Sequence, residues 1–310
     1  MLRYWLLRAL VEVGGRVPVR ITYGLGAVGG NLAWYLSPRI RRATRDHMRH
    51  VLGRDADSAE VDRLARSCVR TNLYYYADFV RFGHIPDDAR TSIFDSFDEV
   101  HGLDALFEAL DQGKGVVLVG AHLGNGEVLA RAAGPFGICI AIVTERLSPP
   151  RLHDYVHHVR GARGVRFLPA DLTGLRASIA HLRAGGSLGL LVDRDVLGTA
   201  EPFPFFGERA PIPAGAVELA RRTGAPMIGA WIPRTGPARY ALHLEPIPLP
   251  EPTGDREVDL ERGMRAMVTA LEGAIRRWPG QWFPISAIWP QDHEPARHAS
   301  PTSHEAEPHS

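Results

Sequence analysis

The chain contains little cysteine and almost no lysine. Cys68 and Cys139 are its two cysteines among 310 residues. They lie far apart in apolar surroundings, so the sequence predicts no disulfide framework and favours a reducing compartment. Lys114 is the sole lysine, and arginine supplies nearly all of the positive charge. The formal net charge is only +1, which argues against nucleic-acid binding as the main function.

The sequence also lacks the signatures of several common enzyme classes. It has no Gly-x-Ser-x-Gly elbow, which disfavours a serine hydrolase. It has no His-Glu-x-x-His signature, and we expect no metal cofactor. Residues 21–38 carry no charge and just reach the length of a transmembrane helix, but they include four glycines. This composition favours a membrane-lying segment or a re-entrant hairpin over a membrane span.

What is present is an alternation of apolar strands and amphipathic helices. At 45% hydrophobic residues, the chain can bury one substantial core. The alternation predicts an α/β fold with a mostly parallel central sheet and helices on both sides. The expected strands cover 116–120, 138–143, 165–168, 187–192, 227–232 and 240–244, and the main helices of this part cover 102–110, 149–160, 174–184, 215–222 and 257–278. We expect a helical portion over 1–85, an α/β core over 86–290 and a disordered polar tail over 291–310.

One histidine stands at the end of the first buried strand. The stretch Gly115–Glu127 delivers His122 into a glycine-rich turn, at the strand's carboxyl end where open α/β sheets place their chemistry. Glycines at 124 and 126 allow this turn to bend back, so that the carboxylate of Glu127 can reach the imidazole. We therefore predict that His122 is a general base oriented by Glu127. Backbone N–H groups around 124–126, or a nearby arginine, are expected to hold an oxyanion.

Two further polar clusters follow neighbouring strands of the predicted sheet. Glu145 and Arg146 follow one strand, and Asp193, Arg194 and Asp195 follow another. Because the carboxyl ends of parallel strands meet at one edge, these clusters should converge with His122. The predicted substrate-binding residues are Gly124, Asn125, Glu145, Arg146, Arg160, Asp193 and Arg194.

The amino-terminal residues suggest contact with lipid. Residues 1–50 contain nine arginines against Glu12 and Asp46, a local excess of seven. Such a segment is attracted to anionic headgroups, by roughly 1 kcal/mol for each arginine close to the surface. The apolar residues around Tyr4 and Trp5 are typical of an amphipathic interfacial helix. We expect an anionic membrane surface as a partner.

Four motifs together resemble a known family. They are His122-Leu-Gly-Asn-Gly-Glu127, Glu145-Arg146-Leu147, Leu191-Val-Asp-Arg-Asp195, and Phe205-Phe-Gly-Glu208 with Ile212-Pro-Ala-Gly215. In this order they are similar to the bacterial lipid A acyltransferases and the related phosphatidylinositol mannoside acyltransferases, over residues 20 to 290. The His-x4-acid motif itself is shared with glycerophospholipid acyltransferases generally.

The resemblance implies a membrane-associated O-acyltransferase. It would move a fatty acyl group from acyl-CoA or an acyl carrier protein to a hydroxyl of a membrane glycolipid, without any other cofactor, at the cytoplasmic face of a bacterial membrane. By the resemblance, Glu145 shapes the acceptor and donor site and Arg160 faces an anionic part of the substrate, with Arg163 and Arg166 as competitors for that role. Three alternatives stay open: a lysophospholipid acyltransferase, a thioesterase using the same two residues, and a non-catalytic lipid-binding protein.

Overall fold

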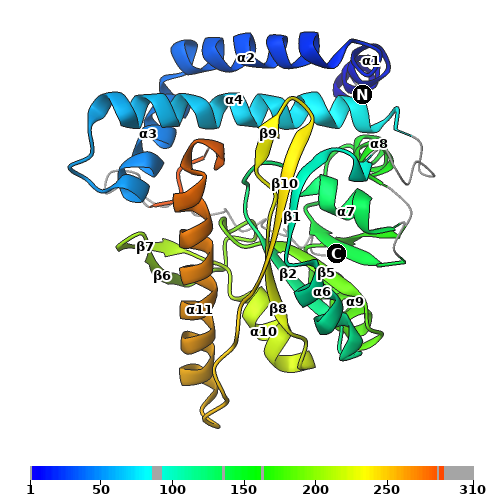
Figure 1. Ribbon diagram of the computed structural model, residues 1–310, viewed down its shortest axis with the longest axis vertical. Coiled ribbons are helices and arrows are strands. Elements are labelled where there is room, and N and C mark those ends of the chain that lie inside the picture. Colours follow the sequence, from blue (N-terminus) through cyan, green and yellow to red (C-terminus); the bar gives the residue numbers. More distant parts are fainter. Residues whose placement is uncertain (1, 86–92, 135–136, 162–163, 285, 290–310) are drawn as a thin grey trace, which may run out of the picture.

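The structure is a computed structural model of the chain, and it describes residues 2–85, 93–134, 137–161, 164–284 and 286–289. The described part of the helical portion expected over 1–85 forms four helices. They are α1 (Leu2–Gly14), α2 (Val19–Leu36), α3 (Pro38–Leu52) and α4 (Ser58–Phe82). The α2 helix lies along α4 at one end of the molecule, with α1 beside it (Figure 1). The expected polar tail, 291–310, falls outside the described residues.

Two details of the amino-terminal helices differ from the sequence-based expectations. The prediction of a re-entrant hairpin within residues 21–38 is wrong, because α2 is one continuous helix through all four glycines. The sequence alone makes Ser58 a plausible cap of α4, but Asp57 caps the helix by accepting a hydrogen bond from the backbone N–H of Glu60 (2.9 Å). Within the described residues, no helix has both the length and the apolar character needed to cross a bilayer.

The central sheet is mostly parallel, as predicted. Its strand order is β1-β10-β8-β2-β5-β3-β4, with β9 paired to β10. The strands β8, β2, β5, β3 and β4 run parallel to one another, and β10 is antiparallel to β8. Their bounds are β1 (Phe97–His101), β2 (Val116–Gly120), β3 (Ile140–Thr144), β4 (Val165–Pro169), β5 (Ser187–Leu191), β8 (Met227–Trp231), β9 (Arg234–Gly236) and β10 (Arg239–Pro246). The sequence did not predict β9, and it left the region of β1 undecided.

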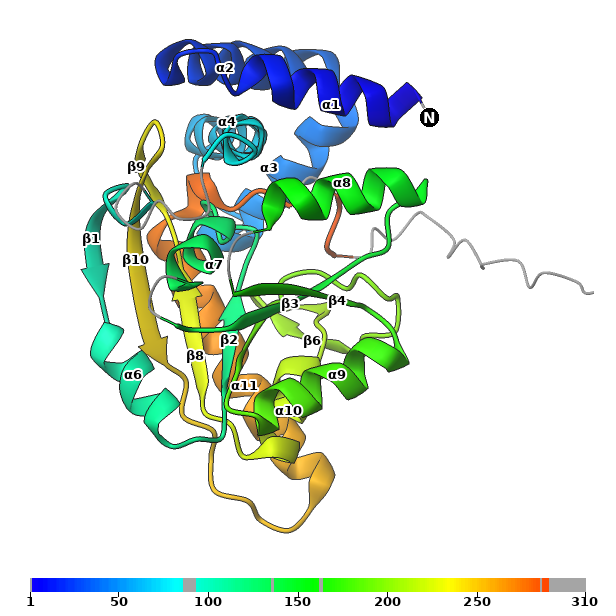
Figure 2. The ribbon, with the colours of Figure 1, turned by 90° about the vertical axis from the view of Figure 1, so that its right-hand side faces the viewer.

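The alternation of side chains along β2 divides the core into two layers. Val117 and Val119 belong to a buried cluster that includes α10 and α11, whereas Val116 and Leu118 belong to a second cluster that includes α6 and α7. Helices therefore cover both faces of the sheet (Figure 2). The core helices are α6 (Leu103–Asp111), α7 (Glu127–Ala133), α8 (Pro150–Arg160), α9 (Leu172–Arg183), α10 (Gly215–Thr223) and α11 (Arg256–Arg277), followed by a short 3-10 turn, η2 (Pro279–Gln281).

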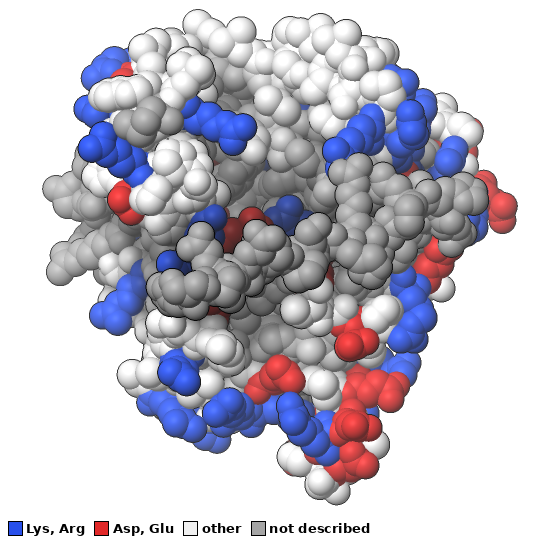
Figure 3. Space-filling view, turned by 180° about the vertical axis from the view of Figure 1, so that it is seen from behind, with Lys and Arg blue, Asp and Glu red and all other residues white. Residues whose placement is uncertain are grey.

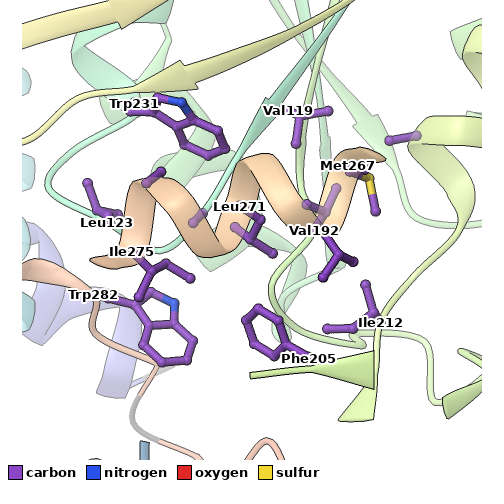
Figure 4. Close-up of a cluster of buried hydrophobic side chains, with 14 of the residues drawn as sticks. Val119, Leu123, Val192, Phe205, Ile212, Trp231, Met267, Leu271, Ile275 and Trp282 are labelled. Carbon is purple, nitrogen blue, oxygen red and sulfur yellow. The ribbon is translucent and has the colours of Figure 1, made fainter. Parts of the chain in front are cut away.

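The prolines and aromatic residues of segment 202–211 predict a loop from the sequence alone, but these residues form a β-hairpin. Its strands are β6 (Pro202–Phe205) and β7 (Glu208–Pro211). Phe205 is fully buried and its ring is stacked on Trp289, with 5.5 Å between the ring centroids. Figure 4 shows Phe205 in the same buried cluster as Trp282 and Leu271 of α11. The aromatic residues of this segment thus fill the core.

His47 of α3 makes stability depend on pH. It is 1% exposed and packs against Trp282 and Trp289, and burial together with repulsion from His50 lowers its pKa to about 4. An unfolded histidine binds its proton near pH 6.5. Between these values the unfolded chain binds more protons, so stability falls as the pH drops from about 6.5 to about 4.

We expect His47 to contribute a loss on the order of 3 kcal/mol in unfolding free energy over that window. Urea unfolding at several pH values should show a shallower dependence for His47→Gln than for the wild type. His101→Gln, at an exposed position, serves as the matched control and should keep the wild-type slope. An unchanged slope in the His47 variant would contradict the assignment.

Candidate active site

The register of two neighbouring strands brings His122 opposite Asp193. Strands β2 and β5 pair in parallel, with Gly120 facing Leu191 at their carboxyl ends. His122 and Asp193 each stand two residues beyond these strand ends. The imidazole Nδ1 lies 2.9 Å from Asp193 Oδ1. The sequence grouped both residues at this edge of the sheet but did not predict that they pair.

Asp193 is held on every side by hydrogen-bond donors. Its side chain is fully buried, and its Oδ2 accepts hydrogen bonds from the backbone N–H of His122 (2.9 Å) and from Trp282 Nε1 (2.8 Å). Burial by itself would raise the pKa of Asp193, but attraction to His122 and these hydrogen bonds lower it overall. The carboxylate therefore stays ionised and keeps the proton of the imidazole on Nδ1. Asp193, predicted as a substrate ligand, instead lies buried behind the histidine.

The other ring nitrogen of His122 is available. Among the described residues, no group is hydrogen-bonded to Nε2, and the imidazole side chain is 26% exposed. The ring of Phe283 approaches it edge-on, with 6.2 Å between the centroids. The backbone N–H of Phe283 also donates to the carbonyl of His122 (2.8 Å). An imidazole that is held at Nδ1 and has no hydrogen bond at Nε2 is arranged to accept a proton from an incoming group.

The structure places Glu127 next to Arg160 and not next to the imidazole. Its Oε1 lies 2.6 Å from Arg160 Nη2 and 2.9 Å from Nε, and it accepts a hydrogen bond from the hydroxyl of Tyr75 (3.2 Å). Burial would lower the pKa of Arg160, but the charge of Glu127 raises it overall. The predicted hydrogen bond between His122 and Glu127 is therefore wrong. As the first residue of α7, Glu127 joins the loop to α8 and α4.

Gly124 and Asn125 hold the loop in its bent form. Gly124 has a φ of +62°, and a Cβ there would come within 1.8 Å of the carbonyl oxygen of Ile232. Asn125 is 1% exposed, and both ends of its amide are bonded to protein groups: Nδ2 to Asp78 and Oδ1 to the N–H of Glu127. The glycine is needed for the close approach. Asn125 stabilises the loop instead of facing a substrate.

Two of the backbone N–H groups predicted to hold an oxyanion, those of Gly124 and Asn125, already donate to protein carbonyls. Gly124 donates to the carbonyl of Gln281 (3.2 Å), and Asn125 donates to the carbonyl of Ile232 (3.0 Å). These two donors are directed at protein carbonyls, so the prediction that they bind an oxyanion is wrong. The remaining parts of that expectation, the N–H of Gly126 and a nearby arginine, stay predictions.

Glu145 and Arg194 pair just beyond the carboxyl ends of β3 and β5, whereas Arg146 pairs with a different residue. Arg194 Nη2 lies 2.8 Å from Glu145 Oε1, which joins the end of β5 to the end of β3. Both side chains line a pocket of about 280 Å³, together with Asp195 and Ser286. Arg146 instead forms an exposed ion pair with Asp171 (2.9 Å). Of the neighbouring clusters, Glu145, Arg194 and Asp195 thus border this pocket.

The arginines considered for anion binding have different surroundings. Arg160 is mostly buried against Glu127, and its guanidinium lies over the ring of Phe167, 4.9 Å from the centroid. Arg166 is exposed on β4, and Arg163 lies outside the described residues. Contact between Arg160 and a substrate stays a prediction.

Within the described residues, one group of three side chains has the composition of a metal site. It consists of Glu99 and His101 on β1 and His243 on β10, whose ligand atoms lie within 4.8 Å of one another. These strands are separated from β2 by β8. The cluster therefore belongs to a different edge of the sheet from His122.

Comparison with known proteins supports the family resemblance that the four sequence motifs indicated. The model of the bacterial lipid A biosynthesis acyltransferase family matches residues 1–290. A phosphatidylinositol mannoside acyltransferase of Mycolicibacterium smegmatis is 28% identical over 217 residues, and one of Mycobacterium tuberculosis is 32% identical over 136 residues. The matched part spans 65% of the length of the first relative and 42% of the second. The chain thus belongs to the bacterial lipid A biosynthesis acyltransferase family.

Proposed function

We propose that the chain transfers a fatty acyl group from an acyl thioester to a hydroxyl of a membrane glycolipid. The observation that carries this proposal is the 2.9 Å contact between His122 Nδ1 and the buried Asp193 carboxylate, with Nε2 left open. The acceptor would be of the phosphatidylinositol mannoside or lipid A type, as in the names of the relatives and of the family. The donor would be acyl-CoA or an acyl carrier protein.

In this mechanism His122 Nε2 removes the proton of the acceptor hydroxyl as its oxygen attacks the thioester carbonyl. Asp193 holds the other ring proton and stabilises the imidazolium that forms. When the tetrahedral intermediate collapses, the C–S bond breaks and the imidazolium returns its proton to the thiolate. The products are an ester and a free thiol. Because the thioester is already activated, the reaction requires no covalent enzyme intermediate.

The pocket bordered by Glu145 and Arg194 is suited to the polar end of a substrate. Arg194 presents a guanidinium beside a half-exposed carboxylate. Guanidinium groups bind phosphate well because their donors match its oxygens. We propose that this pocket receives a phosphate or sugar group of the donor or the acceptor.

A lipid surface is the proposed partner of the amino-terminal helices. Along α2, Ile21, Leu25, Val28, Leu32 and Tyr35 recur at helical spacing, and each is more than half exposed. On α1, Trp5, Leu6 and Leu10 are exposed in the same way. Figure 3 shows the end of the molecule formed by these helices as a largely uncharged surface, with arginines along its flanks. An amphipathic face rimmed by cations is typical of proteins that lie on anionic membranes.

Because acyl-CoA and acyl carrier proteins are cytosolic, we place the protein at the cytoplasmic face of the membrane, bound peripherally through these helices.

Replacing Leu25 and Leu32 together with serine removes two side chains whose burial stabilises binding by roughly 1.5–3 kcal/mol each. Sedimentation with phosphatidylglycerol-containing vesicles should show at least about tenfold weaker binding. Leu172→Ser, at a 75% exposed position on α9, is the control and should bind like the wild type. Equal binding by all three proteins would contradict the proposal.

The activity itself is tested with purified protein, a labelled acyl thioester and total membrane lipid. Mass spectrometry of the labelled products should identify an acylated glycolipid. Labelled free fatty acid as the main product would replace the proposal with a thioesterase, and a labelled phospholipid would replace it with a lysophospholipid acyltransferase. No turnover with vesicle binding intact would indicate a non-catalytic lipid-binding protein.

A further inference from the structure

A buried ionic cluster lies between the amino-terminal helices and the loop of His122. Asp78 of α4 is 1% exposed and forms an ion pair with Arg234 of β9 (2.5 Å). Tyr23 of α2, which is 5% exposed, donates its hydroxyl proton to Asp78 Oδ1 and accepts a hydrogen bond from Arg234 Nη1 (2.7 Å). Burial raises the pKa of Tyr23 to about 12, so the hydroxyl keeps its proton. The three residues are thus hydrogen-bonded or ion-paired to one another in the interior, although Nε and Nη2 of Arg234 have no hydrogen-bond partner among the described residues.

The same carboxylate reaches the catalytic loop. Asp78 Oδ2 accepts a hydrogen bond from Asn125 Nδ2 (2.8 Å), and Asn125 Oδ1 accepts one from the first backbone N–H of α7, that of Glu127 (3.1 Å). The backbone of Arg234 is bonded in both directions to the side-chain amide of Gln281 (2.7 and 3.0 Å). The carbonyl of Gln281 in turn accepts the N–H of Gly124. The loop is therefore fixed at two points, at Asn125 by Asp78 directly and at Gly124 by Gln281, which is bonded to Arg234.

Tyr23 connects the cluster to the helix proposed to lie on lipid. It faces inward from α2, whereas Leu25 and Val28 of the same helix are 65% and 58% exposed. Its ring is stacked on Tyr74 of α4, with 5.0 Å between the centroids. A continuous series of side chains thus runs from α2 through Asp78 to Asn125. Among these described residues, none is hydrogen-bonded to the imidazole.

We infer that Asp78 is a positioning residue for the reaction: through Asn125 it fixes the loop that carries His122, and through Tyr23 it ties that loop to the apolar-faced helix α2. The effect on rate rests on the proposed function, but the effect on the loop does not. Loss of the Tyr23 hydroxyl leaves Asp78 Oδ1 without one of its donors. Loss of the Asp78 charge leaves Arg234 buried without its counter-charge and alters the acceptor of Asn125.

The test compares Tyr23→Phe and Asp78→Asn with two matched controls. Tyr74→Phe removes a hydroxyl from the neighbouring tyrosine, and Asp98→Asn removes the charge of an exposed ion pair with Arg239. Native-state hydrogen–deuterium exchange should be about tenfold faster in peptides covering 120–130 for both test variants. The same peptides in the controls, and peptides from α11 in all variants, should exchange at the wild-type rate.

In the acyl-transfer assay, Asp78→Asn should lower kcat about tenfold, with unchanged KM for the thioester and unchanged vesicle binding. Acceleration of all peptides alike would overturn the inference, because it would mean that the cluster acts on global stability alone. Wild-type exchange of the loop, or wild-type kcat in folded Asp78→Asn, would also overturn it. If Asp78→Asn does not fold, the hydrogen–deuterium exchange rate of residues 120–130 in Tyr23→Phe decides whether the inference holds. A wild-type protein that transfers no acyl group refutes the proposed function, and the exchange data still decide this inference.

Discussion

His122→Ala is expected to lower the rate of acyl transfer by roughly 100- to 10,000-fold, the usual contribution of a general base. The reason is the position of Nε2, which is the ring nitrogen of His122 that is hydrogen-bonded neither to Asp193 nor to any other described group. Alanine leaves the acceptor hydroxyl with only water to take its proton. The backbone contacts of residue 122 with Asp193 and Phe283 do not depend on the side chain, so the fold should be retained.

The measurement is kcat for transfer from a labelled thioester to the glycolipid acceptor, with circular dichroism as a check of folding. His101→Ala changes an exposed histidine on β1 and is the matched control, expected to retain full activity. KM for the thioester should change little in His122→Ala, because the base acts on the acceptor in the transition state. Transfer by folded His122→Ala at a rate close to the wild type would refute the mechanism.

Much of the fold follows from local sequence patterns. The apolar run Val116–Gly120 is bracketed by glycines and is a central strand of the sheet, as predicted. The alternation of strands and helices after it correctly indicates a mostly parallel sheet. The hairpin over 202–211 was missed because its aromatic and proline residues are also typical of loops. Phe205 is buried there through contacts with Trp282 and Trp289, which lie far away in the sequence.

The pairing of His122 with Asp193 could not be predicted from local sequence patterns. Glu127 is five residues from His122 and seemed the natural partner, but it begins α7 and its carboxylate meets Arg160 of α8. Asp193 is 71 residues from His122, and the two meet only because β5 lies next to β2. Strand order is a property of the whole sheet, and no local pattern encodes it. The available signal was positional: each residue stands two places beyond the end of its strand.

Asp193→Asn should lower kcat by roughly a thousand- to ten-thousandfold, comparable to the loss seen when a triad aspartate becomes an asparagine. The expected fall in kcat follows from the hydrogen-bond donors around the carboxylate of Asp193. Oδ2 accepts hydrogen bonds from the N–H of His122 and from Trp282 Nε1, so the amide oxygen of an asparagine would occupy that position. Its NH2 group would then face His122 Nδ1. A donor at that place forces the imidazole proton onto Nε2, and the histidine can no longer act as a base.

The variant Glu127→Gln distinguishes the His122–Asp193 pair from the His122–Glu127 pair that the spacing of the motif suggested. Glutamine keeps an acceptor for Arg160 and Tyr75 but removes the charge of a buried ion pair, so we expect mainly a loss of stability. After correction for the folded fraction, its kcat should fall by no more than about tenfold, because the tautomer of His122 is unaffected. If Glu127→Gln instead loses as much kcat as Asp193→Asn, the carboxylate at 127 takes part in proton transfer. That outcome would mean that the loop rearranges when substrate binds, because in this structure Glu127 is bonded to Arg160 and Tyr75 and not to the imidazole.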